Sequence, residues 1–157
     1  MDGLTRVYFT DQFRDHRGVF CRIPTMMKHV FIETSFSVMY DQVLKGIHGD
    51  KRGNNYKLLT CVAGEIYHVA VDPKTREWEE TYMTPNGPSI LLLPGMGSAV
   101  VAMEKSTLLY QQTEPYEGPE KQFTLRWDDP LIGILWPVSD PILSDRDRLA
   151  PLLREGL

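Results

Sequence analysis

The chain has 157 residues with a formal net charge of −4, and 42% of its residues are hydrophobic and 24% charged. These values are ordinary for a globular protein and suit one domain, which we expect to span residues 1–157. The negative charge argues against a nucleic-acid partner, and no apolar run approaches the roughly 20 residues of a membrane-spanning helix. No signal-peptide pattern opens the sequence, and its two cysteines, Cys21 and Cys61, lack metal-type spacing, so we expect a reducing, cytoplasmic location.

Short segments of alternating or apolar residues recur along the chain, each closed by Gly, Pro, Asn or Asp. A helical turn is expected over 24–31 and a short helix over 143–153, where Ser144 is a candidate N-cap, Asp147 follows three residues later, and Pro151 shortens the helix. This succession of short strands indicates an all-β sandwich or barrel. Strands are predicted over 7–9, 19–23, 36–47 with a break at 41–42, 56–62, 65–71, 77–84, 89–93, 99–103, 107–113, 122–127 and 132–136.

The centre of the sequence is the stretch 44–72, in which His48 lies between two glycines and Lys57 opens a strand. The strands 56–62 and 65–71 are separated by little more than Ala63-Gly64, which predicts a hairpin. His48 and Lys57 would then enter one neighbourhood. A general base beside a cation suits chemistry on a carbonyl-bearing substrate.

Each candidate residue also has a plainer interpretation. His48, with a reference pKa of about 6.5, is the natural base near neutral pH, or else a turn histidine bonded to a carbonyl. Tyr110 is a candidate proton donor, or a core tyrosine with its hydroxyl at the rim. Lys57 is otherwise a solvated lysine at a strand end. Asp147 either orients a histidine or is a first-turn helix residue favoured by the helix dipole.

Arg17 and Lys45 each precede a glycine, an arrangement that can clamp phosphate oxygens or be ordinary surface charge. The glycine-rich loop 94–98 lacks the strand and helix context of a nucleotide-binding fingerprint. The histidines do not form a His-x-His pair with a nearby carboxylate, so no metal site is predicted. The residues considered for a metal site are His16, His29, His48, His68 and Glu65.

Taken together, these motifs resemble the sugar-nucleotide 3,5-epimerases, the family typified by dTDP-4-dehydrorhamnose 3,5-epimerase. The resemblance spans nearly the whole chain. Within the family, the sequence of this chain at residues 47–50, 61–67 and 141–144 resembles that of the branch acting on GDP-4-keto-6-deoxyheptoses. The motifs that carry the family resemblance are residues 13–18, 43–48, 56–58, 69–72, 109–110, 127–130, 136–137 and 143–147.

The resemblance implies a cupin-type jelly-roll barrel without metal or cofactor, usually a homodimer that exchanges N-terminal strands. The implied substrate is a GDP- or dTDP-linked 4-keto-6-deoxy sugar of surface-polysaccharide or related deoxysugar biosynthesis, including capsule and lipopolysaccharide. By motif match, His48 is the base, oriented by Asp147, while Lys57 stabilises the enolate oxygen and Tyr110 returns a proton from the opposite face. The implied substrate-binding residues are Arg17, Lys45, Phe20, Ser98 and Tyr116.

Several positions depart from the family pattern. Lys45 stands where the family has arginine, Ser98 where typical members carry a second histidine, Val100 where the heptose branch has one, and Val19 in place of a frequent glutamate. These changes indicate altered sugar specificity, epimerisation at one centre only, or lost activity. The changes at Lys45, Ser98 and Val100 motivate one alternative, a catalytically silent cupin barrel that binds a sugar nucleotide or protein partner. A further alternative is a metal-dependent cupin oxygenase, which the spacing of the histidines does not favour.

Overall fold

The computed structural model describes residues 3–23 and 28–154, and most of its strands form two antiparallel β-sheets. This arrangement confirms the expected all-β, cupin-type jelly roll with a short C-terminal helix, α1 (Asp145–Arg148). Among the described residues, no helix is long and apolar enough to cross a membrane. The first sheet contains, in spatial order, β1 (Thr5–Phe9), β9 (Pro88–Leu92), β6 (Lys57–Ala63), β11 (Ser106–Gln112) and β4 (Glu33–Met39). The second contains β12 (Gln122–Thr124), β5 (Leu44–Asp50), β10 (Gly97–Ala102), β7 (Ile66–Val71) and β8 (Trp78–Met83).

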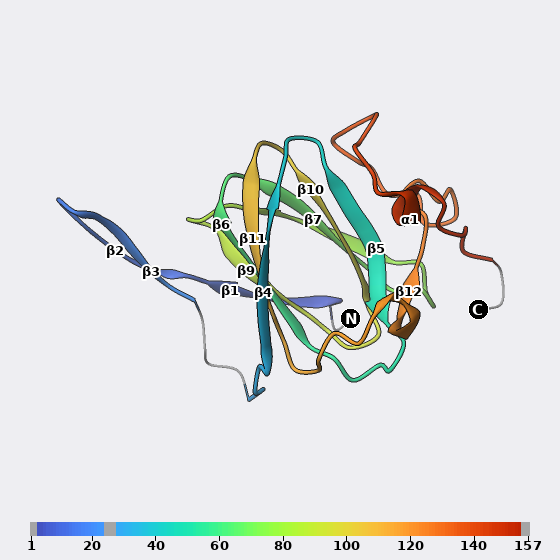
Figure 1. Cartoon of the computed structure of the whole chain (residues 1–157), viewed down its shortest axis with the longest axis horizontal. Helices are drawn as coiled ribbons and strands as arrows, with labels where there is room; N and C mark the ends of the chain where they lie inside the picture. The colour runs from blue at the N-terminus through green and yellow to red at the C-terminus, as the bar shows by residue number, and fades with distance from the viewer. Residues whose placement is uncertain (1–2, 24–27, 155–157) are drawn as a thin grey trace.

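A two-stranded hairpin, β2 (Asp11–Asp15) and β3 (Gly18–Arg22), projects away from these sheets (Figure 1). The polar turn predicted at 15–18 connects its two strands. Every residue of both strands is exposed, including the aromatic pair Phe13 and Phe20, whose ring centroids are 6.2 Å apart. Exposed apolar patches are a common feature of interaction surfaces.

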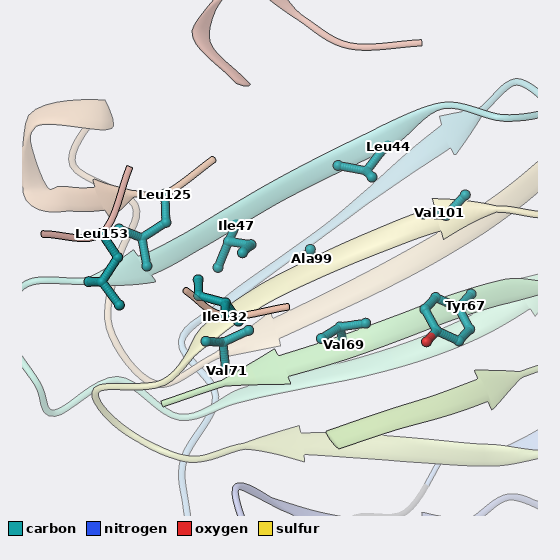
Figure 2. Packing of buried hydrophobic residues seen from close by; sticks show 10 residues of the cluster. All are labelled: Leu44, Ile47, Tyr67, Val69, Val71, Ala99, Val101, Leu125, Ile132 and Leu153. Atoms are coloured by element: carbon teal, nitrogen blue, oxygen red, sulfur yellow. The ribbon is translucent and has the colours of Figure 1, made fainter. Parts of the chain in front are cut away.

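Two apolar clusters hold the fold together. One fills the space between the sheets and takes residues from both, among them Leu59 and Leu108 from the first and Ile66 and Val100 from the second. The other lies on the outer face of the second sheet, where residues after β12 cover it (Figure 2). Because side chains alternate along a strand, β7 contributes to both clusters and all six of its residues are buried. The outer cluster consists of Leu44, Ile47, Tyr67, Val69, Val71, Ala99, Val101, Leu125, Ile132 and Leu153.

The hairpin predicted from strands 56–62 and 65–71 is wrong. β6 pairs with β9 and β11 in the first sheet, whereas β7 pairs with β10 and β8 in the second. The chain passes between sheets at Gly64, which has φ +80° and whose added Cβ would lie 2.3 Å from Ser106 Oγ. The Ser106 hydroxyl accepts the Glu65 N–H at 3.1 Å and so fixes this corner. Both strands are apolar on both faces, so their sequence pattern does not distinguish pairing within one sheet from packing across two.

Four further expectations are corrected by the structure. Residues 132–136 form no strand; they are apolar because Ile132, Ile134 and Trp136 pack on the outer cluster. The predicted strand 122–127 is paired only over β12. The C-terminal helix has its predicted N-cap, since Ser144 Oγ accepts the Asp147 N–H at 3.2 Å. It is shorter than the expected 143–153, however, because it ends at Arg148, three residues before Pro151. Residues 24–27 of the expected helical turn lie outside the described residues, and 28–31 are not helical.

Candidate functional site

A cavity of about 480 Å³ opens between the two sheets, a volume typical of small-molecule sites. Side chains of both sheets line it, so it has two rigid, opposed walls. The first sheet contributes Glu33, Ser35, Lys57, Leu59, Tyr110 and Gln112, and the second contributes Lys45, His48, Ser98, Val100 and Gln122. Tyr116 and Arg146 complete the lining.

On the wall formed by the second sheet, His48 is held by a buried carboxylate. Its Nε2 lies 2.5 Å from Asp147 Oδ1, and the Asp147 side chain is only 3% exposed. Asp147 Oδ2 also accepts the Gly46 N–H at 3.2 Å. Burial alone would raise the pKa of Asp147, but the hydrogen bond and charge of His48 and the Gly46 N–H outweigh it and leave that pKa below its usual value. The ionised carboxylate therefore fixes the proton on Nε2, and Nδ1 is the ring atom that can accept another.

On the opposite wall, Tyr110 and Lys57 come from neighbouring strands, β11 and β6. Burial raises the pKa of Tyr110, which keeps the phenol protonated and able to donate, while its hydroxyl lies 3.2 Å from Ser37 Oγ. Burial lowers the pKa of Lys57, and no salt bridge is present for it among the described residues. A poorly solvated ammonium group interacts strongly with any negative charge that develops in the cavity.

Three cationic side chains, Lys45, Lys57 and Arg146, line the cavity against one carboxylate, Glu33. Arg146 is held by Gln122 Oε1 at 3.0 Å and Thr124 Oγ1 at 2.8 Å, which leaves its charge uncompensated by these partners. Such a lining favours an anionic ligand, and a guanidinium group suits phosphate oxygens.

The structure gathers most of the predicted site residues around this cavity. His48, Lys57, Tyr110, Lys45, Ser98 and Tyr116 line it, and Asp147 lies directly behind His48. The structure does not bring Arg17 and Phe20 there within one chain. They lie on the projecting β2–β3 hairpin, where Arg17 is paired with Asp15 at 2.6 Å.

Sequence reasoning missed Arg146, Glu33, Ser35 and Gln122 as lining residues. Arg146 lies next to Asp147 in a motif that had been singled out, and this adjacency was the available signal. Residues 33, 35 and 37 alternate along β4 toward the cavity, but the predicted strand began only at 36. Within residues 3–23 and 28–154, no three His, Cys, Asp or Glu side chains gather as a group that could hold a metal ion.

The sequence model of the family described as dTDP-4-dehydrorhamnose 3,5-epimerase matches residues 3–155. The chain is 34% identical over 140 residues to the dTDP-4-dehydrorhamnose 3,5-epimerase of Salmonella typhimurium, a match covering 83% of this chain and 75% of the relative. It superposes with a TM-score of 0.87 and 25% identity on a Legionella pneumophila 3,5-epimerase in complex with dTDP-4-keto-L-rhamnose, covering 95% and 87% of the two chains. A 3'-monoepimerase of Streptomyces bikiniensis in complex with dTDP-quinovose superposes with a TM-score of 0.86 and 27% identity, covering 96% and 84%.

Proposed function

The chain belongs to the dTDP-4-dehydrorhamnose 3,5-epimerase family, and on this premise we propose that it epimerises a nucleotide-linked 4-keto-6-deoxy sugar at C3, C5 or both. One observation carries the proposal. His48, a base oriented by a carboxylate, and Tyr110, a protonated phenol, lie on opposite sheets of one cavity. Inversion of a carbon centre requires removal of a proton from one face and delivery to the other, which this arrangement supports.

The first step of the proposed reaction is proton removal beside the C4 ketone. The C–H bond breaks, the proton passes to His48 Nδ1, and the electron pair forms an enolate whose charge resides on the C4 oxygen. Asp147 stabilises the imidazolium that results, and the Lys57 ammonium group meets the enolate oxygen. In the second step Tyr110 donates its phenolic proton to the same carbon from the opposite face. Solvent then returns the catalytic groups to their starting protonation.

The cationic lining supports a diphosphate-linked substrate. Arg146 and Lys45 lie on the His48 side of the cavity, and both also line a second hollow of about 340 Å³ that adjoins His48. We assign the diphosphate to these two residues. The relatives reported above are named for dTDP-linked sugars or are in complex with them, so we place thymidine ahead of guanosine as the nucleotide.

The decisive experiment is incubation with dTDP-4-keto-6-deoxyglucose in D2O, with deuterium at C3 and C5 followed by NMR. Deuterium uptake is expected at one or both carbons, and the ratio identifies the carbons from which a proton is removed. His48→Ala should abolish it. Binding of the nucleotide sugar without exchange at either carbon would refute the proposal, and faster exchange with the GDP-linked sugar would overturn the choice of nucleotide.

We further propose a homodimer in which the β2–β3 hairpin reaches the partner's cavity. Support comes from its exposed Phe13 and Phe20, and from the distance at which it projects from its own barrel (Figure 1). Arg17 and Phe20 would then contact the substrate bound by the other subunit. We also propose a reducing, cytoplasmic location, with which two free cysteines, Cys21 exposed and Cys61 buried, are compatible.

Complementation between inactive variants tests this arrangement. Co-expressed Arg17→Ala and His48→Ala chains form mixed dimers in which one site combines an intact His48 with an intact Arg17 from the partner. Activity should therefore reappear in the mixed dimer although each variant alone is impaired. Failure of the isolated mixed dimer to exceed the more active parent would contradict action across the interface, and a monomer by light scattering would exclude the dimer itself.

A further inference from the structure

His68 is a buried histidine that the proposed reaction does not use. It lies on β7 with 1% of its surface exposed, on the face that points between the sheets. Along its own strand its neighbours on this face are Ile66 and Ala70, and in the adjacent strands it pairs with Val100 on β10 and Thr81 on β8. An aliphatic side chain would pack here without the cost of burying a polar ring.

The imidazole makes one hydrogen bond among the described residues, from its Nε2 to Ser98 Oγ at 3.1 Å. Ser98 lines the cavity, whereas His68 lies behind it and is not part of the lining. The Ser98 hydroxyl therefore connects a buried ring to the space that holds the ligand.

Ser98 is also the β10 residue that pairs in register with His48 on β5. A hydroxyl at this position lies on the same wall of the cavity as His48. Ser98 is half-buried and remains open to the cavity.

Burial lowers the pKa of His68 to about 4, so the ring is neutral at physiological pH. A neutral imidazole has one N–H and one bare nitrogen, and a hydroxyl has one hydrogen and two acceptor lone pairs. Whichever direction the His68–Ser98 hydrogen bond takes, it determines whether Ser98 presents its hydrogen or its lone pairs to the cavity.

We propose that His68 is a positioning residue that orients the Ser98 hydroxyl to hydrogen-bond an oxygen of the bound sugar on the His48 wall. The inference rests on the proposed function, since it takes the sugar of a nucleotide-linked 4-keto sugar as the ligand.

Four variants test the coupling, each assayed by deuterium exchange at C3 and C5. Ser98→Ala and His68→Leu should each lower kcat/KM by about three- to tenfold, the range of one neutral hydrogen bond. His68→Gln places an amide near the position of Nε2 and should retain activity within about twofold. The double variant should be no worse than Ser98→Ala alone, because both changes remove the same interaction.

Two outcomes overturn the inference. A wild-type level of kcat/KM in Ser98→Ala or in His68→Leu would show that the pair does not act on the substrate. Losses that multiply in the double variant would assign His68 an independent structural role. Absence of exchange in the wild-type protein would instead refute the proposed function, so the two failures are distinguishable.

A measurement on the unmodified protein covers the case in which His68→Leu does not fold. The imidazole nitrogen shifts of His68, read by long-range ¹H–¹⁵N NMR, should change when dTDP-6-deoxyglucose binds and stay unchanged with dTDP alone. The sugar is the part that reaches Ser98. Identical His68 spectra with the two ligands would refute the role.

Discussion

Replacement of Asp147 by asparagine tests the catalytic base most directly, because the carboxylate accepts two hydrogen bonds and the amide has only one oxygen. Asp147 receives the His48 Nε2–H on Oδ1 and the Gly46 N–H on Oδ2. If the amide oxygen of the variant faces Gly46, its NH2 faces Nε2, and the ring must carry its proton on Nδ1. That tautomer cannot accept a proton from the substrate.

The opposite orientation of the amide restores the tautomer but directs NH2 at the Gly46 N–H, which costs about 1–3 kcal/mol for a buried, unsatisfied donor. The base-competent form is then disfavoured by about 5- to 150-fold. Loss of the charge that stabilises the imidazolium removes a further ~1.5–3 kcal/mol. We therefore expect kcat to fall by about 10²- to 10⁴-fold, the range found for acid–base groups, with KM little changed.

Deuterium exchange at C3 and C5 measures this effect, and Asp145→Asn is the matched control. Asp145 lies in the same helical turn, but its side chain is 84% exposed and pairs with Arg148. The control should retain near-normal kcat. A kcat for Asp147→Asn within fivefold of wild type, in a folded protein, would refute the tautomer argument.

The same substitution also has an effect on stability that depends on pH. Because the pKa of Asp147 is lowered in the folded protein, its ionisation stabilises the fold at pH values above the unfolded pKa of about 3.9. That stabilisation is lost as the pH falls through the folded pKa, so the Tm difference between wild type and variant should shrink toward about pH 3.

Other substitutions separate catalysis from stability. Tyr110→Phe should lower kcat at least about 100-fold, whereas Ser37→Ala, which removes only its hydrogen-bond partner, should cost less than about tenfold; equal losses by deuterium exchange would contradict the role of Tyr110. Lys57→Met should abolish exchange. It should also raise Tm, by about 2–4 °C for each kcal/mol of free energy of unfolding gained, because a buried cation whose pKa is lowered destabilises the fold. An unchanged or lower Tm by calorimetry would contradict this. Wild-type stability should correspondingly rise with pH between that lowered pKa and about 10.4. Gly64→Ala should lower the free energy of unfolding, measured by urea denaturation, by about 1–3 kcal/mol. The loss should be larger than for the control Gly53→Ala, since Gly53 has φ +70° but nothing within 4 Å of an added Cβ. Equal losses would show that the contact of residue 64 with Ser106 is unimportant.

Local features of this protein could be predicted from the sequence because they depend on near neighbours. Alternation and turn residues located most strands to within a few positions, as for β7 at Ile66–Val71 against an expected 65–71. The N-cap at Ser144 was recognisable because capping depends on residue type at fixed spacing. Residues 132–136 were misassigned because an apolar run that packs on a sheet has the same composition as a strand within it.

Strand pairing could not be predicted, because it depends on contacts far apart in the chain. β6 finds its partners at β9 and β11, and nothing in the local pattern of 57–63 specifies them. The cavity residues of β4 were missed because the predicted strand began only at 36, and because its antiparallel pairing with β11, which places Ser35 opposite Tyr110, is a long-range contact. The site that Arg17 reaches could not be predicted from contacts within one chain either, because in our proposal it contacts the cavity of the other subunit.

The passage between sheets at Gly64 is also what makes the proposed chemistry geometrically consistent. Had β6 and β7 formed one hairpin, Lys57 would share a sheet with the strands that lie beside His48, and a planar enolate would meet its cation and its base from one side. Because the chain changes sheets, Lys57 and Tyr110 lie on the wall opposite His48, with the cavity between them. A proton can then leave one face of the sugar carbon and return to the other while rigid strands hold both groups. The chain makes this change of sheet at Gly64, whose left-handed φ and close contact with Ser106 would strain any residue that carries a Cβ.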